Sequence, residues 1–369
     1  MHVAGASSNP PARRDGRRSS AKSPGGIDAH ADAVPYVVPT RRCHNPWPCS
    51  VHVVPTLTSR PMTTRFQDHR RRLFGIAYRM LGVRADAEDV LQDAWLRWSR
   101  QDVAALQSAE AWLVTVVTRL AIDRLRALKA EREAYVGWWL PEPLVELQGD
   151  HADSGGIHHN TPESAAKLAG ELSVAFLYVL ERLGPEERAA FLLRQVFDYD
   201  YPEIAAHLGK TEAACRQTVH RASERVQQAR TRFEVPRNVH RQLLQRFMQA
   251  AHSGDRNAIE ALLSEDAQLI GDGGGKVAAF PQPLVGRFRI AILYWAQHRG
   301  LGAQLVYRMA LINGEPGLLH YANGRLDSVQ AFVTDGEHIV AIHAVRNPDK
   351  LTRVPAVLDE HWRQRSDGF

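Results

Sequence analysis

The amino-acid sequence predicts a multidomain chain in which two all-α units, the second of them a helix-turn-helix, precede a cone-shaped α+β unit. Apolar residues recur at helical spacing from Met62 to about residue 233. Within that span, the segment 201–222 has the turn glycine and the helix cap of a helix-turn-helix. From residue 239 onward, helical patterns give way to strand-like runs, so one helical layer should cover a curled antiparallel sheet.

The first 61 residues differ in composition from everything that follows them. They hold nine of the 20 prolines, and their eight basic and three acidic residues account for the whole net charge of +5. They show neither helical nor strand periodicity, which is typical of a disordered tail. Two explanations stay open: the basic tail adds nonspecific affinity for DNA, or translation of the natural protein starts at Met62.

Composition and cysteine usage disfavour several classes of protein. No stretch approaches the roughly 18 apolar residues of a membrane helix, and the arginine-bearing N-terminus lacks the apolar segment of a signal peptide. Three scattered cysteines make no disulfide framework and indicate a reducing cytoplasm. Cys43, His44, Cys49 and His52 match no standard zinc spacing. We therefore expect no metal, no cofactor and no contact with a membrane.

An acidic helix is the first unusual feature of residues 62–134. It follows a helix that ends at Gly82, and it begins with the sequence "DAEDVLQDAW". At about 100° per residue, its apolar side chains fall in one arc that belongs to a core. Its polar side chains fill the opposite, outward arc: Asp86, Glu88, Asp89, Gln92 and Asp93. Such an arc is either an ordinary solvated face or a docking surface for a basic protein.

The long helix predicted next, in "SAEAWLVTVVTRLAIDRLRALKAERE", is basic on its polar face. Its apolar arc again belongs to a core, whereas the other face carries Arg119, Asp123 and Arg124. The helix also bears an aromatic side chain, Trp112. A basic face with an aromatic residue suits phosphates and unstacked bases.

A linker rich in Gly, Asp, His and Ser separates this unit from the second, which is predicted over 172–233. Gly209 supplies the turn between two helices, Thr211 caps the second helix, and Cys215 is a small core residue. The outward side of the second helix has the side chains needed for base edges and phosphates: Arg216, Gln217, His220 and Arg221.

The third unit is predicted over 239–352, with a tail at 353–369. Its segment "DGGGK" lacks the spacing of a phosphate loop. Three glycines permit positive φ and close backbone approach, so we expect this loop to touch another domain. Several side chains could line the cone: Trp295, His298, Tyr307, His320, Tyr321 and His343. A histidine–aspartate pair there would suit proton abstraction, but side chains that simply fill the mouth of the cone are the simpler explanation.

Residues 62–232 resemble a sigma-70 family factor of the extracytoplasmic-function group. The resemblance implies region 2 over 62–134, a linker over 135–171 and region 4 over 172–233. It implies that the acidic strip binds the clamp helices of the largest polymerase subunits. It places the −10 element on Trp112, Thr115, Arg119, Asp123 and Arg124, and the −35 element on Thr211, Arg216, Gln217, His220 and Arg221. Many members have Arg-Asn at Thr118-Arg119, so the detailed −10 readout cannot be carried over.

The third unit resembles SnoaL-like domains, which are fused to one subgroup of these factors. Motifs of that subgroup match "YVGWWLPEPL" in the linker, "DGGGK" and "NPDKL". The resemblance implies that this domain both supports and restrains activity, through contacts at Asp272, Gly273, Gly274, Gly275, Lys276, Asn347, Pro348, Asp349 and Lys350. Of these, Asp349 and Lys350 are expected to lie exposed on a Pro-fixed turn.

The sequence therefore predicts a non-enzymatic sigma factor that binds core RNA polymerase and promoter DNA, regulated in cis by its last domain, in which a small-molecule ligand has room to bind. The alternative is a DNA-binding transcriptional regulator whose cone senses a metabolite or is catalytic.

Overall fold

The computed structural model describes residues 62–102, 105–147, 172–229 and 235–357. The expectations for the tail at 1–61, for most of the linker and for the last residues of the chain lie outside these ranges. Within them, no helix is both long and apolar enough to cross a membrane.

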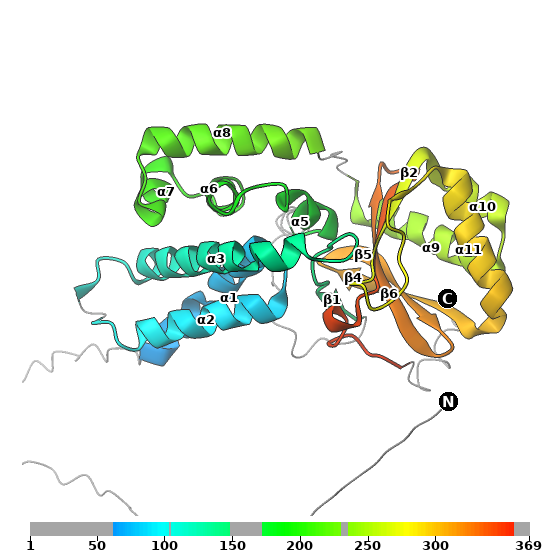
Figure 1. The fold of residues 1–369 in the computed structure, drawn as a ribbon, viewed down its shortest axis with the longest axis horizontal. Coiled ribbons are helices and arrows are strands. Elements are labelled where there is room, and N and C mark those ends of the chain that lie inside the picture. The colour runs from blue at the N-terminus through cyan, green and yellow to red at the C-terminus, as the bar shows by residue number, and fades with distance from the viewer. Residues whose placement is uncertain (1–61, 103–104, 148–171, 230–234, 358–369) are drawn as a thin grey trace, which may run out of the picture. The chain divides into compact units, whose positions relative to one another are not determined.

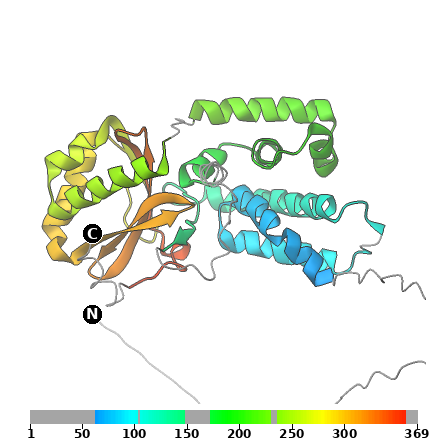
Figure 2. The same ribbon diagram turned by 180° about the vertical axis from the view of Figure 1, so that it is seen from behind.

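The first unit is a bundle of three helices whose ends are set by local signals. Gly82, with φ of +71°, ends the first helix in the left-handed conformation that glycine favours. Ser108 begins the third helix, because its hydroxyl accepts a hydrogen bond from the Ala111 amide at 3.2 Å. The helices, seen in Figures 1 and 2, are α1 (Met62–Leu81), α2 (Arg84–Trp98) and α3 (Ala109–Glu133).

The second unit contains the predicted helix-turn-helix. Gly209 has φ of +65° between α7 and α8, and the Thr211 hydroxyl caps α8 by accepting from the Ala214 amide at 3.3 Å. Cys215 is fully buried, as expected of a core residue. One continuous hydrophobic core contains side chains of both helical units. The described helices of this unit are α5 (Val174–Leu180), α6 (Pro185–Gln195), α7 (Tyr201–Leu208) and α8 (Glu212–Ala229).

The third unit is built on a seven-stranded sheet in the order β1-β4-β5-β6-β7-β2-β3. The predicted antiparallel sheet is wrong in one pairing, because β2 runs parallel to β7. A parallel pair needs a long crossover, and residues 273–338 supply it. Its described strands are β1 (Val145–Glu146), β2 (Leu263–Asp272), β3 (Leu284–Val285), β4 (Leu305–Ile312), β5 (Glu315–Ala322), β6 (Arg325–Thr334) and β7 (Ile339–Val345).

Both faces of this sheet are covered, although one helical layer was predicted. Helices α9 (Arg237–Ser253), α10 (Arg256–Ala261) and α11 (Arg287–Leu301) pack on one face (Figure 1). The linker and α5 cover the other face, where Leu140 and Val174 join a second core. Strand β5 is accordingly buried from 316 to 321 without the alternation of a half-exposed strand.

The beginning of the linker is part of this sheet. Strand β1 pairs antiparallel with β4, with Val145 opposite Ile312. The chain that leaves region α1–α3 is therefore fixed to the third unit before it reaches α5. The sequence predicted only a connection here.

Candidate polymerase and DNA surfaces and the junction between domains

The polar face of α2 is open to solvent over most of its length. Asp89, Gln92 and Asp93 are exposed. Glu88 is partly exposed and pairs with Arg70 at 2.6 Å. These four side chains lie where a basic partner can reach them.

Asp86 departs from this pattern, and the prediction that it faces outward is wrong. It is only 8% exposed, and its Oδ1 accepts hydrogen bonds from Arg124 Nε at 2.9 Å and Nη2 at 2.6 Å. The bond to Asp86 raises the pKa of the Arg124 guanidinium above its ordinary value. The first turn of α2 packs against α3, so this pair ties the two helices together. Arg124, predicted to meet the −10 element, forms this pair while 42% of its side chain stays exposed.

The α3 face predicted to meet the −10 element is also in contact with α7. Thr115 Oγ1 lies 2.7 Å from His207 Nδ1, and Arg119 Nε donates to the His207 carbonyl at 3.2 Å. The Thr115 hydroxyl also reaches the Ala111 carbonyl on its own helix, 2.8 Å away. Burial lowers the pKa of the His207 imidazole, and neighbouring Glu203 opposes that effect.

A second contact joins α3 to the helix-turn-helix unit. Arg126 reaches Asp123 on its own helix at 3.1 Å and Glu186 of α6 at 2.6 Å. Asp123 itself stays exposed, and Trp112 is half-buried beside Trp98, with ring centroids 5.8 Å apart. The −10 face is thus partly covered by region α5–α8.

The recognition helix α8, by contrast, presents its predicted DNA face to solvent. Gln217, His220 and Arg221 are exposed. Arg216 is exposed as well; it pairs with Glu212 one turn earlier and lies over the Tyr201 ring, 4.4 Å from its centroid. The two predicted DNA surfaces therefore differ in accessibility.

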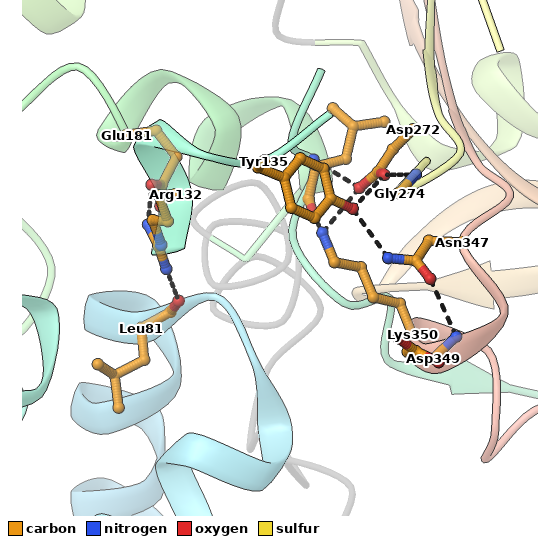
Figure 3. Close-up of polar contacts among 10 residues, drawn as sticks. Leu81, Arg132, Tyr135, Glu181, Asp272, Gly274, Asn347, Asp349 and Lys350 are labelled. Atoms are coloured by element: carbon orange, nitrogen blue, oxygen red, sulfur yellow. Dashed lines mark hydrogen bonds and ion pairs between the residues drawn. The ribbon is translucent and has the colours of Figure 1, made fainter. Parts of the chain in front are cut away.

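Two arginines donate hydrogen bonds to the last carbonyl groups of α1, and Figure 3 shows one of them. Arg132 Nη2 donates to the Leu81 carbonyl at 2.6 Å, and Arg188 Nη1 donates to the Met80 carbonyl at 2.6 Å. Both pair with Glu181 of the α5 end. Burial lowers the pKa of Arg132, while Glu181 acts in the opposite direction. Cations at the carbonyl end of a helix also interact favourably with its dipole.

Asp272 lies at the centre of a junction between the linker and the third unit (Figure 3). Its side chain is 0% exposed. Its oxygens accept hydrogen bonds from the Tyr135 hydroxyl at 2.5 Å, the Leu140 amide at 2.9 Å and the Gly274 amide at 3.1 Å. Burial and the bond to Asp272 raise the pKa of Tyr135. The expected contact between "DGGGK" and another part of the chain is present, and Asp272 makes its hydrogen bonds to the linker.

Lys350 completes the junction, and its predicted exposure is wrong. It is 8% exposed, with Nζ 2.7 Å from Asp272 Oδ2 and 2.6 Å from the Leu140 carbonyl. The ammonium also lies 4.2 Å from the centroid of the Trp139 ring. Burial lowers the pKa of Lys350, and Asp272 opposes this. The 3₁₀ turn Pro348–Lys350 directs this side chain inward.

The remaining motif residues shape the same junction. Asn347 Nδ2 donates to the Tyr135 hydroxyl at 2.8 Å. A Cβ at Gly274 would collide with Asn347, and one at Gly275 would lie 3.1 Å from Val136 Cβ, so both positions need glycine. At Gly273, such a carbon would meet the backbone. Lys276 and Asp349 form a surface pair at 2.5 Å.

Asn313 forms a further connection among three segments. Its Nδ2 donates to the Tyr78 hydroxyl of α1 at 2.8 Å and to the Leu172 carbonyl at 2.9 Å. Its Oδ1 accepts from the Leu144 amide of the linker at 2.9 Å. One buried amide therefore holds both helical units and the linker to the β4–β5 turn.

Sequence reasoning missed several of these residues. Tyr135 opens the linker motif "YVGWWLPEPL", but the sequence alone indicates no role for its side chain. Asn313 precedes a glycine in a hairpin, which predicts a turn and nothing more. Of the six side chains considered for the interior of the cone, only His320 lines the pocket of about 220 Å³ that Leu269 and Asp327 also line. His343 instead packs against Tyr178 of α5, with ring centroids 5.5 Å apart and the ring planes tilted by 55°.

Comparisons with known proteins match the same segments. The family model for sigma-70 region 2 matches residues 65–131, and that for sigma-70 region 4 matches residues 173–226. The chain is 35% identical over 303 residues to the ECF RNA polymerase sigma factor SigJ of Mycobacterium tuberculosis, across 79% of this chain and 94% of that protein. It is 27% identical over 301 residues to the probable ECF RNA polymerase sigma factor SigI of the same species, across 81% and 97%.

A solved structure covers all three units. The crystal structure of the M. tuberculosis extracytoplasmic function sigma factor SigJ matches with a TM-score of 0.62 and 32% identity, over 80% of this chain and 99% of that one. The chain therefore belongs to the extracytoplasmic-function group of sigma-70 factors. Its helical units are sigma regions 2 and 4, and its third unit is an α+β domain with a seven-stranded mixed sheet. Such factors bind core RNA polymerase and promoter DNA, direct transcription initiation and are not enzymes.

Proposed function

We propose that the third domain of this sigma factor regulates it in cis by fixing the path of the linker between regions 2 and 4. The observation that carries this proposal is the buried carboxylate of Asp272. It accepts a hydrogen bond from Tyr135, two residues after α3 ends, and another from the Leu140 amide. The counter-ion of that carboxylate, Lys350, comes from the same domain. The linker is therefore held by an ion pair that the third domain supplies.

Holding the linker also holds regions 2 and 4 against each other. Arg119 and Thr115 contact His207 in this arrangement, so the −10 face must leave α7 before it can bind melted DNA. The outward face of α8 needs no such change. The restrained arrangement accordingly allows −35 contact but opposes −10 contact. A coupling of only about 1–3 kcal/mol between the two states changes their populations severalfold to a hundredfold.

The individual surfaces keep the roles that the sigma family implies, with two changes. Core polymerase docks on Glu88, Asp89, Gln92 and Asp93, while Asp86 and Arg124 position α2 on α3 instead of meeting a partner. The −10 element meets Trp112, Thr115, Arg119 and Asp123. The −35 element meets Thr211, Arg216, Gln217, His220 and Arg221. Partners of this kind place the protein in the cytoplasm.

Run-off transcription with purified core polymerase tests the regulatory proposal. Asp272→Asn keeps the shape of the side chain but removes the charge that holds Lys350, and Tyr135→Phe removes only a hydroxyl. Both should raise promoter-dependent transcription severalfold. Asp349→Asn is the matched control, because its pair with Lys276 lies at the surface. If both junction variants fold, as judged by circular dichroism, and transcribe like the wild type, the restraint does not exist.

A further inference from the structure

Helix α9 of the third domain has an exposed face without an acidic side chain. None of its 17 residues is Asp or Glu. Its buried arc, which includes Leu244 and Phe247, packs into the core of the domain. The opposite arc is exposed and consists mainly of arginine and amide side chains: Asn238, Arg241, Gln242, Gln245, Arg246 and Gln249. Long helices of the sigma regions differ, since Asp89 of α2 and Glu224 of α8 are exposed.

The chain around α9 is positively charged, although residues 62–369 together carry no net charge. Between His220 and His252 the sequence has seven arginines and two glutamates. Neither Arg241 nor Arg246 forms an ion pair with any residue that the structure describes. Arginine and amide side chains are those that proteins use to contact DNA phosphates, and each arginine that meets a phosphate gains from the release of counterions.

The connection to α8 keeps α9 close to DNA. Arg221, the last residue of the proposed −35 surface, lies about 12 Å from the C-terminal end of α8, at about 1.5 Å per residue. Residues 230–236 join the two helices and span at most about 28 Å. Helix α9 therefore begins within about 40 Å of the −35 surface, little more than one turn of B-DNA. In any arrangement of the two domains, α9 stays near the phosphates that flank the −35 element.

We propose that the exposed face of α9 binds the phosphate backbone of promoter DNA within about one helical turn of the −35 element, without reading base sequence. Arg241 and Arg246 pair with phosphates, and the amide groups of Gln242 and Gln245 donate hydrogen bonds to phosphate oxygens. The location of this contact rests on the proposed reading of the −35 element by α8, which brings the third domain to the DNA. DNA is favoured over an acidic protein surface because the short connection to α8 places DNA beside this face.

Binding of the reconstituted holoenzyme to a labelled promoter duplex, measured by fluorescence anisotropy at several KCl concentrations, tests the proposal. Each phosphate contact contributes about 0.9 to the steepness of log affinity against log salt. The double variant Arg241→Gln with Arg246→Gln should therefore lose about 1.8 of that steepness and bind about ten- to sixtyfold more weakly in about 0.1 M KCl. Arg289→Gln with Arg299→Gln is the matched control, because these exposed arginines lie on α11 of the same domain and remove the same charge. The control should bind like the wild type.

Hydroxyl-radical footprinting of the same complexes locates the contact. Backbone protection within about one turn of the −35 element should be lost in the α9 variant alone, and a changed flanking sequence should leave wild-type affinity unaltered. An unchanged salt dependence, or an equal loss in the α11 control, would overturn the proposal. Weaker binding of core polymerase without DNA, together with an unchanged footprint, would overturn it as well and make this face a protein contact.

Base substitutions in the −35 element test the reading by α8 separately. They should weaken binding of the wild type and of the α9 variant by the same factor, because phosphate contacts add to affinity whatever the sequence. If these substitutions leave wild-type affinity unchanged, the proposed −35 reading fails. If they weaken it while the α9 variant binds like the wild type, the α9 contact alone fails.

Discussion

Replacing Lys350 with methionine removes the charge that faces Asp272 and keeps a side chain of similar length. The two side chains are 8% and 0% exposed, with Nζ and Oδ2 2.7 Å apart. Removing one partner of a buried ion pair costs about 3–5 kcal/mol, because the other charge is left uncompensated. Asp272 keeps the hydrogen bonds from Tyr135 and Leu140. We therefore expect a loss near the lower end, about 3 kcal/mol of unfolding free energy.

Urea unfolding followed by circular dichroism measures this loss, and Lys276→Met is its matched control. Lys276 pairs with Asp349 in the same two motifs, but these side chains are 53% and 63% exposed. An exposed pair contributes about 0–1 kcal/mol. The double variant Lys350→Met with Asp272→Asn has no buried charge at this pair. Its loss of unfolding free energy should therefore be at least about 1 kcal/mol smaller than the sum of the two single-variant losses. Equal losses for the two lysine variants, or strictly additive losses in the double variant, would refute the reasoning.

Three further predictions concern the contact at α7, the acidic strip and the recognition helix. Burial lowers the pKa of His207 below its ordinary value of 6.5. The contact of His207 with α3 is therefore favoured above pH 6.5 and weakens below it, because the released imidazole then takes up a proton. Small-angle scattering should show expansion of the chain from about pH 7.5 to about 5.5, and this expansion should be absent in His207→Gln. Reversing Asp89 and Asp93 to lysine should weaken core polymerase binding. The loss should be about 2–5 kcal/mol for each charge pair that is desolvated in the interface and far less for a pair at the interface rim. Unchanged affinity would mean that the acidic strip is an ordinary solvated face. Arg216→Ala and Gln217→Ala should lower −35-dependent transcription, by about 1–3 kcal/mol for a base contact, with relaxed preference at one base pair; unaltered promoter use would mean that another surface reads the element.

The ends of several helices were predictable from local signals. Gly82, Ser108, Gly209 and Thr211 end or begin helices through their own backbone freedom or hydroxyl groups, so their neighbours in sequence suffice. The helical wheel also separated the exposed Asp89 from its buried neighbours. It failed at Asp86, because whether a first-turn carboxylate faces solvent depends on which helix packs beside it. Arg124 lies 38 positions away in the chain.

The junction was only partly predictable for the same reason. The glycines after Asp272 indicated a close approach, but nothing local showed that Tyr135 would be the neighbour. Lys350 was expected at the surface because lysine is seldom buried without a partner. Its partner Asp272 ends β2, whereas Lys350 lies in the 3₁₀ turn after β7, and the parallel pairing of β2 with β7 brings the two together. Long-range pairing of this kind leaves no periodic signal in the sequence.

The central claim, that the third domain holds regions 2 and 4 together through Asp272, is tested most directly by the distance between those regions in solution. Fluorescent labels on non-natural amino acids at Arg97 of α2 and Gln228 of α8, both exposed, avoid the native cysteines. Single-molecule energy transfer should show one compact population in the otherwise wild-type chain. Asp272→Asn should move a substantial fraction of molecules to lower transfer efficiency, and Asp349→Asn should not. An unchanged distribution in folded Asp272→Asn would contradict the account.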